Sequence, residues 1–392
     1  MPPTNGARGT DNLGATRKYD VADVISLLDV ARYPLLAILT NAGKDPVTKQ
    51  GDALKKKETT DPEFKWFEDK FGAREDIVAA NQSGAASLVV TNGAYFSIGD
   101  VLLCVKSAQG TGNPTGEVML VTNVNTNTLT LQRQVGDGSL GGGLLQQNDI
   151  IWIIGNANEE GASIREIKAT TVAEAINYCQ IFRTTIGITE TAKNTTGWTK
   201  ESDFDYQTRK KGIEHLIDVE RAFLFGKKEM IMSGVHPKRF TGGILQRINQ
   251  VSSNVATRDD FNGFLRTLFA HGNTEKYLLS SGYVLDKISS FAHDKLQVLQ
   301  GEKTFGLSIV KYVSPHGTLN ILKHDLFTGD LYGKSAVGLD MEALTYRYLS
   351  NRDTKLLTNR QAPGEDSNVN EYLTECGLQM EQPERHAVVK FS

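Results

Sequence analysis

Histidine is the side chain that most often serves as a metal ligand or a general base, and this chain contains seven histidines. They are His215, His236, His271, His293, His316, His324 and His386. They are spread singly, and the HExxH pattern, which would place metal ligands on one helical face, is absent from the sequence. Such spacing is typical of surface or packing histidines and predicts no metal site.

The cysteines and serines offer no nucleophile. Cys104, Cys179 and Cys376 are odd in number, far apart and never in a CxxC pair, which supports neither a disulfide framework nor a zinc site. A GxSxG turn, which exposes a catalytic serine, does not occur in the sequence.

Adjacent acidic residues and one glycine-rich turn are the remaining candidates for chemistry. Neighbouring carboxylates, as in Glu159-Glu160 and Asp259-Asp260, point apart on either a helix or a strand, so they form no acid and base pair. The stretch GTGNPTG (110–116) joins two strand-like runs and lacks the lysine of a P-loop, so it predicts a flexible hairpin loop. The sequence therefore predicts no catalytic, cofactor-binding or metal-binding residue, and a protein that is not an enzyme.

Length and composition set the limits for the elements. With 392 residues the chain exceeds one usual hydrophobic core, so two or more compact units are expected. The formal charge of -3 and the pI near 6.2 argue against a protein that grips nucleic acid through a basic face. The N-terminus has no signal-peptide pattern and no stretch reaches the length of a membrane span, so we expect no membrane and synthesis in a reducing cytoplasm.

The first 75 residues read as an arm followed by polar and apolar segments. Residues 1–19 have no apolar period and are expected to gain order only against a partner. The segment from Val21 to Leu39 has many aliphatic side chains but is too short to bury them itself, which favours Leu28 and Leu36 as contacts to another surface. Residues 43–75 suit a projecting loop. Its aromatic residues Phe64, Trp66 and Phe67 either anchor on a neighbouring molecule or form a local cluster, and the sequence leaves both readings open.

The middle of the chain changes from strands to a long helix. Short apolar runs separated by Gly, Asn and Asp turns fill residues 86–155 and predict a small β-barrel or sandwich, with a hairpin at Asn125-Thr126-Asn127. Residues 178–195 read as a strand. From 203 to 225 the apolar period and the absence of proline predict a long amphipathic helix, which Gly226 is placed to end. Shorter helical patterns follow in 258–300, and strand-like runs follow at 306–313, 318–323, 335–349 and towards the C-terminus.

Two short motifs within this order of parts resemble a known family. The strand QIFRTTIGIT (180–189) is similar to a "TQIFRTTVGVT"-like strand before a spine helix, and AFLFGK (222–227) is similar to an "ALLFGK"-like helix end. On these motifs, and on the order of arm, β-rich excursion, helix and final strand pair, the chain resembles the major capsid proteins of tailed bacteriophages with the Hong Kong 97 fold. The resemblance covers almost the entire chain.

The resemblance implies an α+β fold with four parts. Residues 1–50 would be the N-terminal arm, and 51–190 the extended loop that reaches over a neighbouring subunit. Residues 191–250 with 336–392 would form the peripheral domain, with the spine helix at about 203–225, and 251–335 the axial domain. The β-rich segment at about 86–155 departs from the simplest family member, and we expect it to be a domain inserted in the extended loop.

The same resemblance implies a function and partners. The protein would assemble in the host cytoplasm into hexamers and pentamers of an icosahedral head that encloses double-stranded DNA without binding a particular sequence. A separate scaffolding protein and a portal protein are expected, because nothing in 1–50 resembles a fused coiled coil, and a decoration protein is an open possibility. The alternatives are an encapsulin-like compartment shell and a hydrolase or ligand-binding protein that uses residues 86–155.

Overall fold

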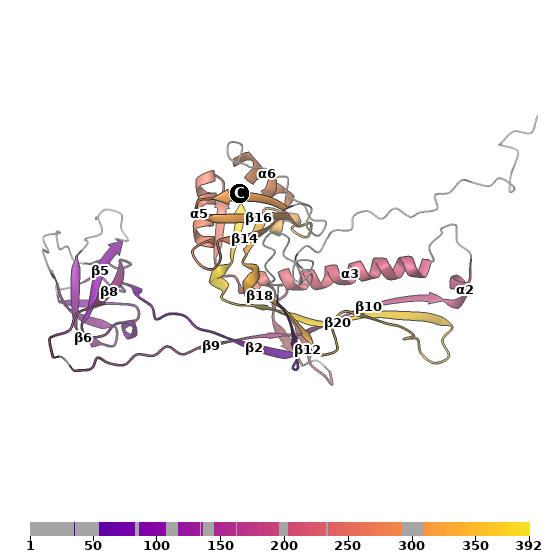
Figure 1. Cartoon of the computed structure of the whole chain (residues 1–392), viewed down its shortest axis with the longest axis horizontal. Helices are drawn as coiled ribbons and strands as arrows, with labels where there is room; N and C mark the ends of the chain where they lie inside the picture. The colour runs from indigo at the N-terminus through magenta and orange to yellow at the C-terminus, as the bar shows by residue number, and fades with distance from the viewer. Residues whose placement is uncertain are drawn as a thin grey trace, which may run out of the picture. The chain divides into compact units, whose positions relative to one another are not determined.

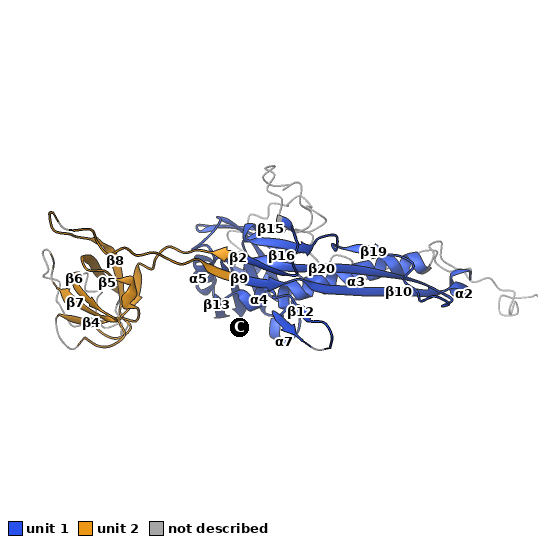
Figure 2. Cartoon of the chain, turned by 90° about the horizontal axis from the view of Figure 1, so that it is seen from below, with its two compact units in different colours: residues 1–66, 175–392 blue, residues 67–174 orange. Residues whose placement is uncertain are grey.

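The computed structural model describes Leu35 and residues 55–82, 86–106, 117–133, 135, 145–161, 163–195, 203–232, 234–291 and 309–392. The chain divides into two compact units, residues 1–66 with 175–392 and residues 67–174, which Figure 2 colours separately. Strands β2 (Glu63–Glu68) and β9 (Ala173–Tyr178) pair with each other and carry the chain from one unit to the other. Each unit has a hydrophobic core of its own.

The larger unit contains a sheet built around one long strand. Its order is β1 (Lys55–Thr59), β18 (Leu344–Leu349), β20 (Ser367–Met380) and β10 (Gln180–Thr189), with β19 (Lys355–Leu357) also paired to β20. The pair β1 and β18 is parallel, and the other pairs are antiparallel. Helix α3 (Asp203–Phe225) runs along this sheet and packs on β10 and β20 (Figure 1). Val219 and Phe223, one helical turn apart, are completely or almost completely buried in the core between them.

A second, six-stranded sheet of the larger unit carries two helices. Its order is β13 (Val251–Val255), β21 (Ala387–Phe391), β17 (Ser335–Leu339), β14 (Glu275–Ser280), β16 (Gly317–Lys323) and β15 (Ile309–Ser314). Helices α5 (Arg258–Leu268) and α6 (Gly282–Phe291) bury their apolar faces in this region (Figure 1). A Cβ at Gly338 would lie 2.7 Å from a methyl group of Leu268, so glycine allows α5 to approach β17 closely.

Short elements join these layers in the larger unit. They are α2 (Glu190–Lys193), α4 (Ile244–Arg247), α7 (Gly329–Tyr332), the 3-10 turns η4 (Met341–Ala343) and η5 (Pro383–Arg385), and the hairpin of β11 (Glu229–Ile231) and β12 (Lys238–Phe240). None of the helices in the described part of the chain is long and apolar enough to cross a membrane.

The smaller unit is a closed β-barrel. Its sheet has the order β3 (Glu75–Ile77), β8 (Ile150–Asn156), β5 (Asp100–Lys106), β6 (Val118–Asn125), β7 (Thr128–Gln132) and β4 (Ser87–Val89). The barrel closes between β3 and β4, where Val78 bridges Val90 and the amide of Ala79 donates to the carbonyl of Val89 at 2.9 Å. Alternate side chains, such as Leu102, fill the interior, and the turn η3 (Gly93–Tyr95) lies between β4 and β5.

Most elements lie where the sequence predicts them. The long helix occupies Asp203–Phe225 as predicted, and the amide of Gly226 donates to the carbonyl of Ala222 at its end. The hairpin at residues 125–127 is confirmed, with Thr126 at a φ of 51°. The predicted barrel or sandwich is a barrel, and its first strand, β3, lies before residue 86.

One prediction about the local structure is wrong. We expected a projecting loop over residues 43–75, but 55–59 form strand β1 and 63–68 form strand β2. The polar run of Lys55 to Glu58 pairs in register with β18, and the ammonium group of Lys56 lies 5.0 Å from the centre of the Tyr348 ring. A charged strand fits this edge because the lysine stem covers aromatic surface while its head bonds Asp353. The predicted loop at 110–116 and the patterns at 292–300 lie outside the described residues.

Candidate functional site

Phe64 and Trp66, two of the predicted assembly contacts, lie on the inner face of β2. Only 4% of Phe64 and 7% of Trp66 are exposed, and their rings stack with centroids 6.1 Å apart. The guanidinium of Arg247 lies 4.9 Å from the Trp66 ring centre, and that of Arg347 lies 5.9 Å from the Phe64 ring centre. The two aromatic side chains therefore pack within their own chain, as the reading of a local cluster expects.

Phe67, the third aromatic residue of this group, faces solvent. Its side chain is 73% exposed, because alternate residues of a strand point to opposite faces. Leu28 and Leu36 lie outside the described residues. The prediction that these residues contact a neighbouring subunit stays a prediction, and Phe67 is the described residue that has free surface for it.

Leu35 is bonded to helix α3 through a buried carboxylate. The Leu35 side chain is fully buried in the core of the larger unit, and its amide donates to Oε1 of Glu220 at 3.0 Å. The same oxygen lies 2.6 Å from Nε2 of His324. Because Nδ1 of His324 accepts from the amide of Leu326 at 3.2 Å, Nε2 carries the ring proton and donates to the carboxylate. A buried carboxylate thus joins three distant parts of the chain.

His215 ties the same helix to the sheet beneath it. Its Nδ1 lies 2.9 Å from the hydroxyl of Thr184 on β10, and its Nε2 lies 2.7 Å from the hydroxyl of Thr374 on β20. Thr374 in turn donates to Thr354 at 2.9 Å, so it accepts from the histidine. Burial lowers the pKa of His215, which keeps the ring neutral and suited to this bridging role.

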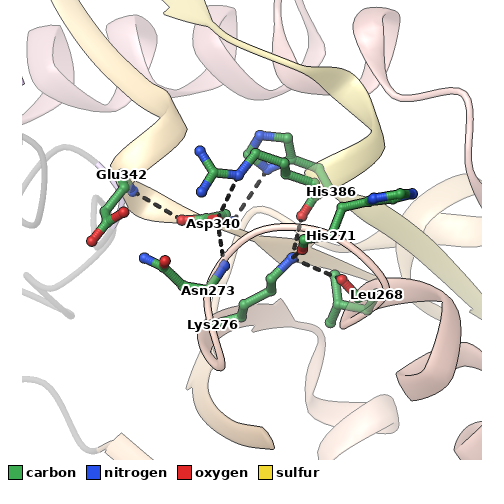
Figure 3. Close-up of polar contacts among 8 residues, drawn as sticks. Leu268, His271, Asn273, Lys276, Asp340, Glu342 and His386 are labelled. Carbon is green, nitrogen blue, oxygen red and sulfur yellow. Dashed lines mark hydrogen bonds and ion pairs between the residues drawn. The ribbon is translucent and has the colours of Figure 1, made fainter. Parts of the chain in front are cut away.

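Lys276 is a fully buried lysine on β14, and its ammonium group lies at the end of α5 (Figure 3). Its ammonium group donates three hydrogen bonds of 2.7 Å, to the carbonyls of Leu268, His271 and Arg385. Burial lowers the pKa of Lys276 to about 8, so the group is still charged at neutral pH. Lys276 therefore holds the turn after α5 against the turn before β21.

Asp340 organises the polar groups beside this lysine (Figure 3). It forms an ion pair with Arg385 at 3.0 Å and accepts from the amides of Asn273 and Glu342 at 3.2 Å each. The amide of Asp340 donates to Nδ1 of His386 at 3.2 Å. Burial lowers the pKa of His386 to about 4, so its ring is neutral at physiological pH.

These buried groups hold separate parts of the larger unit together. Among the described residues, no three or more His, Cys, Asp or Glu side chains lie close enough together to hold a metal ion. The three cysteines are buried, and burial raises the pKa of Cys179 to about 12, which disfavours the reactive thiolate.

The anchoring roles of Lys276, Glu220 and His324 were not predicted from the sequence. For Lys276 a signal exists, because Lys276 and Leu278 alternate on the inward face of β14 and the strand pattern therefore places a lysine in the core. For Glu220 and His324, 104 positions apart, no local pattern exists, since their burial depends on meeting each other in the fold.

Comparisons with known proteins address the whole chain. The family model for the SU10 major capsid protein matches residues 4–391. The major capsid protein of Pseudomonas phage PaMx41 is 24% identical over 305 residues, which cover 72% of each chain. The fold is similar to the capsid of a native GTA particle, computed with C5 symmetry, with a TM-score of 0.51 and 8% identity over 100% of both chains. A chain of Mycobacterium phage Cain gives a TM-score of 0.49 and 9% identity over 99% of both chains.

The family match and the fold agree with each other. The matched residues 4–391 include every described element, from β1 to β21, and the long helix α3 stands where the resemblance to Hong Kong 97-like capsid proteins places the spine helix. The chain therefore belongs to the SU10 major capsid protein family, and it is a phage capsid protein with a Hong Kong 97-like fold that builds the shell together with other copies of itself.

Proposed function

We propose that this protein forms hexamers and pentamers that close into an icosahedral head around the double-stranded DNA of a tailed phage. The observation that carries the proposal is the match of the family model to residues 4–391, nearly the entire chain. Assembly takes place in the host cytoplasm, before DNA enters the shell. The net charge of -3 suits a subunit that lines packaged DNA without tight binding, because strong binding grows with the number of phosphates neutralised.

We assign the parts of the chain to the domains that the resemblance implies. Residues 1–50 act as the arm, and 51–190 as the extended loop that lies over a neighbouring subunit, although β1 and β10 near its two ends pair in the sheet packed on α3. Residues 191–250 with 336–392 form the peripheral domain along α3, and 251–335 form the axial domain, whose strand β13 pairs with β21, at the centre of each capsomer. The barrel of residues 67–174, a compact unit with its own core, supports the idea of a domain inserted in the extended loop.

The proposed partners are a separate scaffolding protein, a portal protein and, on the finished head, a decoration protein. The subunit itself carries out no reaction. In support, the charged groups that line a hollow of about 790 Å³ beside the end of α3 are one arginine and one aspartate, Arg221 and Asp325. The stronger support is that the family model matching the chain is that of a structural capsid protein.

Co-expression with the scaffolding protein tests the proposal. Negative-stain microscopy should show closed hollow particles with hexameric and pentameric capsomers, and sedimentation should show few free subunits. A protein that remains monomeric with the scaffolding protein present would contradict the proposal. Particles that enclose a specific cargo enzyme and no DNA would favour an encapsulin-like shell instead.

A further inference from the structure

Much of the outer surface of the barrel in residues 67–174 is apolar. The outward positions of strands β3, β8, β5 and β6 include the six side chains that we call the barrel patch. These are Ile77, Val101, Leu103, Leu120, Trp152 and Ile154. Ile77, Trp152 and Ile154 are 46%, 47% and 50% exposed, and the other three are partly buried. The patch is continuous across the strands, because Leu103 pairs with Trp152 and Val101 pairs with Leu120.

The remaining outer surface of the same barrel is different. Strands β6, β7 and β4 present four hydroxyl side chains there, with Val89 as the apolar exception. The four are Ser87, Thr122, Thr128 and Thr130. A barrel that faces water all round would carry polar residues on both sides. The contrast therefore indicates that the barrel patch is covered in the working form of the protein.

Strand β8 is apolar on both its inward and its outward face. Its inward residue Ile151 is fully buried, and its outward neighbours Trp152 and Ile154 are also large and apolar. A strand that is apolar on both faces is typical of burial on both faces. Continuous exposed apolar surface of this kind is often functional.

The charge of the patch fits a second copy of the same surface. None of the six side chains is charged, and the bordering Glu75 accepts a hydrogen bond of 3.1 Å from Nε1 of Trp152. Two identical charged patches would repel each other, whereas two identical neutral patches can meet across a two-fold axis.

The size of the patch also points to a partner that is already held close. The three most exposed side chains offer roughly 100 Å² each, half of the about 200 Å² of a large side chain, so the whole patch offers roughly 300 to 400 Å². A stable complex of free proteins buries about 800 Å² on each partner. The patch is too small to recruit a protein from solution. It is large enough for copies that a shell already holds near each other at high effective concentration.

We propose that the barrel patch packs against the barrel patch of a second copy of this chain, face to face across a two-fold axis of the assembled shell. The proposal rests on the shell-forming function above. Two sheets in such a contact would lie about 10 Å apart, with Trp152 and Ile154 of each copy buried between them.

Cross-linking of full-length shells tests this contact. In an Ile154→Cys variant, a bismaleimide that spans about 10 Å should link two copies and give a dimer band on a denaturing gel. The matched control is Thr130→Cys, an exposed position on the polar side of the barrel, which should stay monomeric. The native Cys104, Cys179 and Cys376 are buried and should give little background.

A charge variant measures the contribution of the contact to the shell. Ile154→Lys places two like charges at the proposed two-fold contact, so shells should dissociate at a lower denaturant concentration than wild type, while Thr130→Lys shells should match wild type. The melting temperature of the unassembled Ile154→Lys subunit should be unchanged, because residue 154 is half exposed.

The outcomes separate the contact from the function. Normal wild-type shells with no Ile154→Cys dimer and unchanged Ile154→Lys stability would overturn the contact and leave the shell function standing. A cross-link to a different protein, or within one chain, would also overturn it. Wild-type protein that forms no shells would overturn the function and the contact together.

Discussion

The ammonium group of Lys276 is held chiefly by backbone carbonyls. All three of its hydrogens have a carbonyl acceptor at 2.7 Å, which satisfies the group inside a core where a bare charge would be costly. The carbonyls belong to the end of α5, the turn that follows it and the turn before β21. One side chain thus supplies the donor for three carbonyls from separate parts of the chain.

Replacement of Lys276 by methionine should destabilise the unassembled subunit by about 2–4 kcal/mol, because three buried carbonyls lose their donor. Chemical denaturation at pH 7 measures the change. Lys390→Met on β21, where the side chain is exposed, is the matched control and should change stability by less than about 0.5 kcal/mol. Equal effects of the two substitutions would show that the carbonyl contacts of Lys276 contribute nothing.

His386 makes the stability of the subunit depend on pH. Its pKa is about 4 in the fold and 6.5 in the unfolded chain, so between these values the unfolded chain binds a proton that the folded chain does not. The contribution of the neutral ring is complete above pH 6.5 and is lost as the pH falls towards 4. The loss amounts to roughly 3 kcal/mol when complete.

A His386→Asn variant should remove this part of the pH dependence, because the asparagine oxygen can still accept from the amide of Asp340 but does not titrate. The measurement is the free energy of unfolding of the unassembled subunit from pH 7 to pH 4.5. His316→Asn, at an exposed turn, should keep the wild-type slope. A variant at His386 that loses stability on acidification as steeply as wild type would rule out the ring as the cause.

At the scale of elements, helix α3 is bonded to the sheet through the imidazole of His215. Thr374 is the acceptor for Nε2 of this ring. In a Thr374→Val variant the shape is kept but the buried N–H has no acceptor, so the melting temperature of the unassembled subunit should fall by an amount equivalent to about 1–3 kcal/mol. Thr185→Val, exposed on β10, is the control and should leave the melting temperature unchanged. A similar melting temperature for both variants would contradict the bridging role.

The elements themselves could largely be predicted from the sequence. Strands β4 to β8 show a local alternation of apolar side chains, and helix α3 is marked by its long run without proline. The pairing of β1 with β18 could not be predicted, since Lys56 pairs with Tyr346 near the other end of the chain and a run of lysines by itself favours an exposed loop. The capping box of Thr257 and Asp260 at the start of α5 was readable in the sequence and was missed.

At the scale of the whole molecule, strands β2 and β9 connect a Hong Kong 97-like body to a closed barrel. The order of the parts along the chain could be predicted from short motifs, but the closure of the barrel through Val78 and Val90 could not, because it depends on an isolated bridge just beyond the ends of β3 and β4.

Strand β2 carries one buried and one exposed phenylalanine, so substitutions on it can distinguish effects on the subunit core from effects on assembly. Phe67 lies three residues after Phe64 on β2, yet it is 73% exposed where Phe64 is 4% exposed. If Phe67 meets a neighbouring subunit, Phe67→Asp should leave the melting temperature of the unassembled subunit unchanged and lower the shell yield at least several-fold, because the shell must bury an unpaired charge.

Two further variants of the same strand make the Phe67 experiment decisive. Phe64→Asp should lower the melting temperature of the unassembled subunit strongly, since the charge would enter the cluster with Trp66 and Cys179. Phe67→Leu should restore most of the shell yield, because an apolar side chain can still cover the contact. If Phe67→Asp shells form with wild-type yield and stability, Phe67 is not part of the assembly surface. If the melting temperature of the unassembled Phe67→Asp subunit is lowered, the residue contributes to the subunit's own fold.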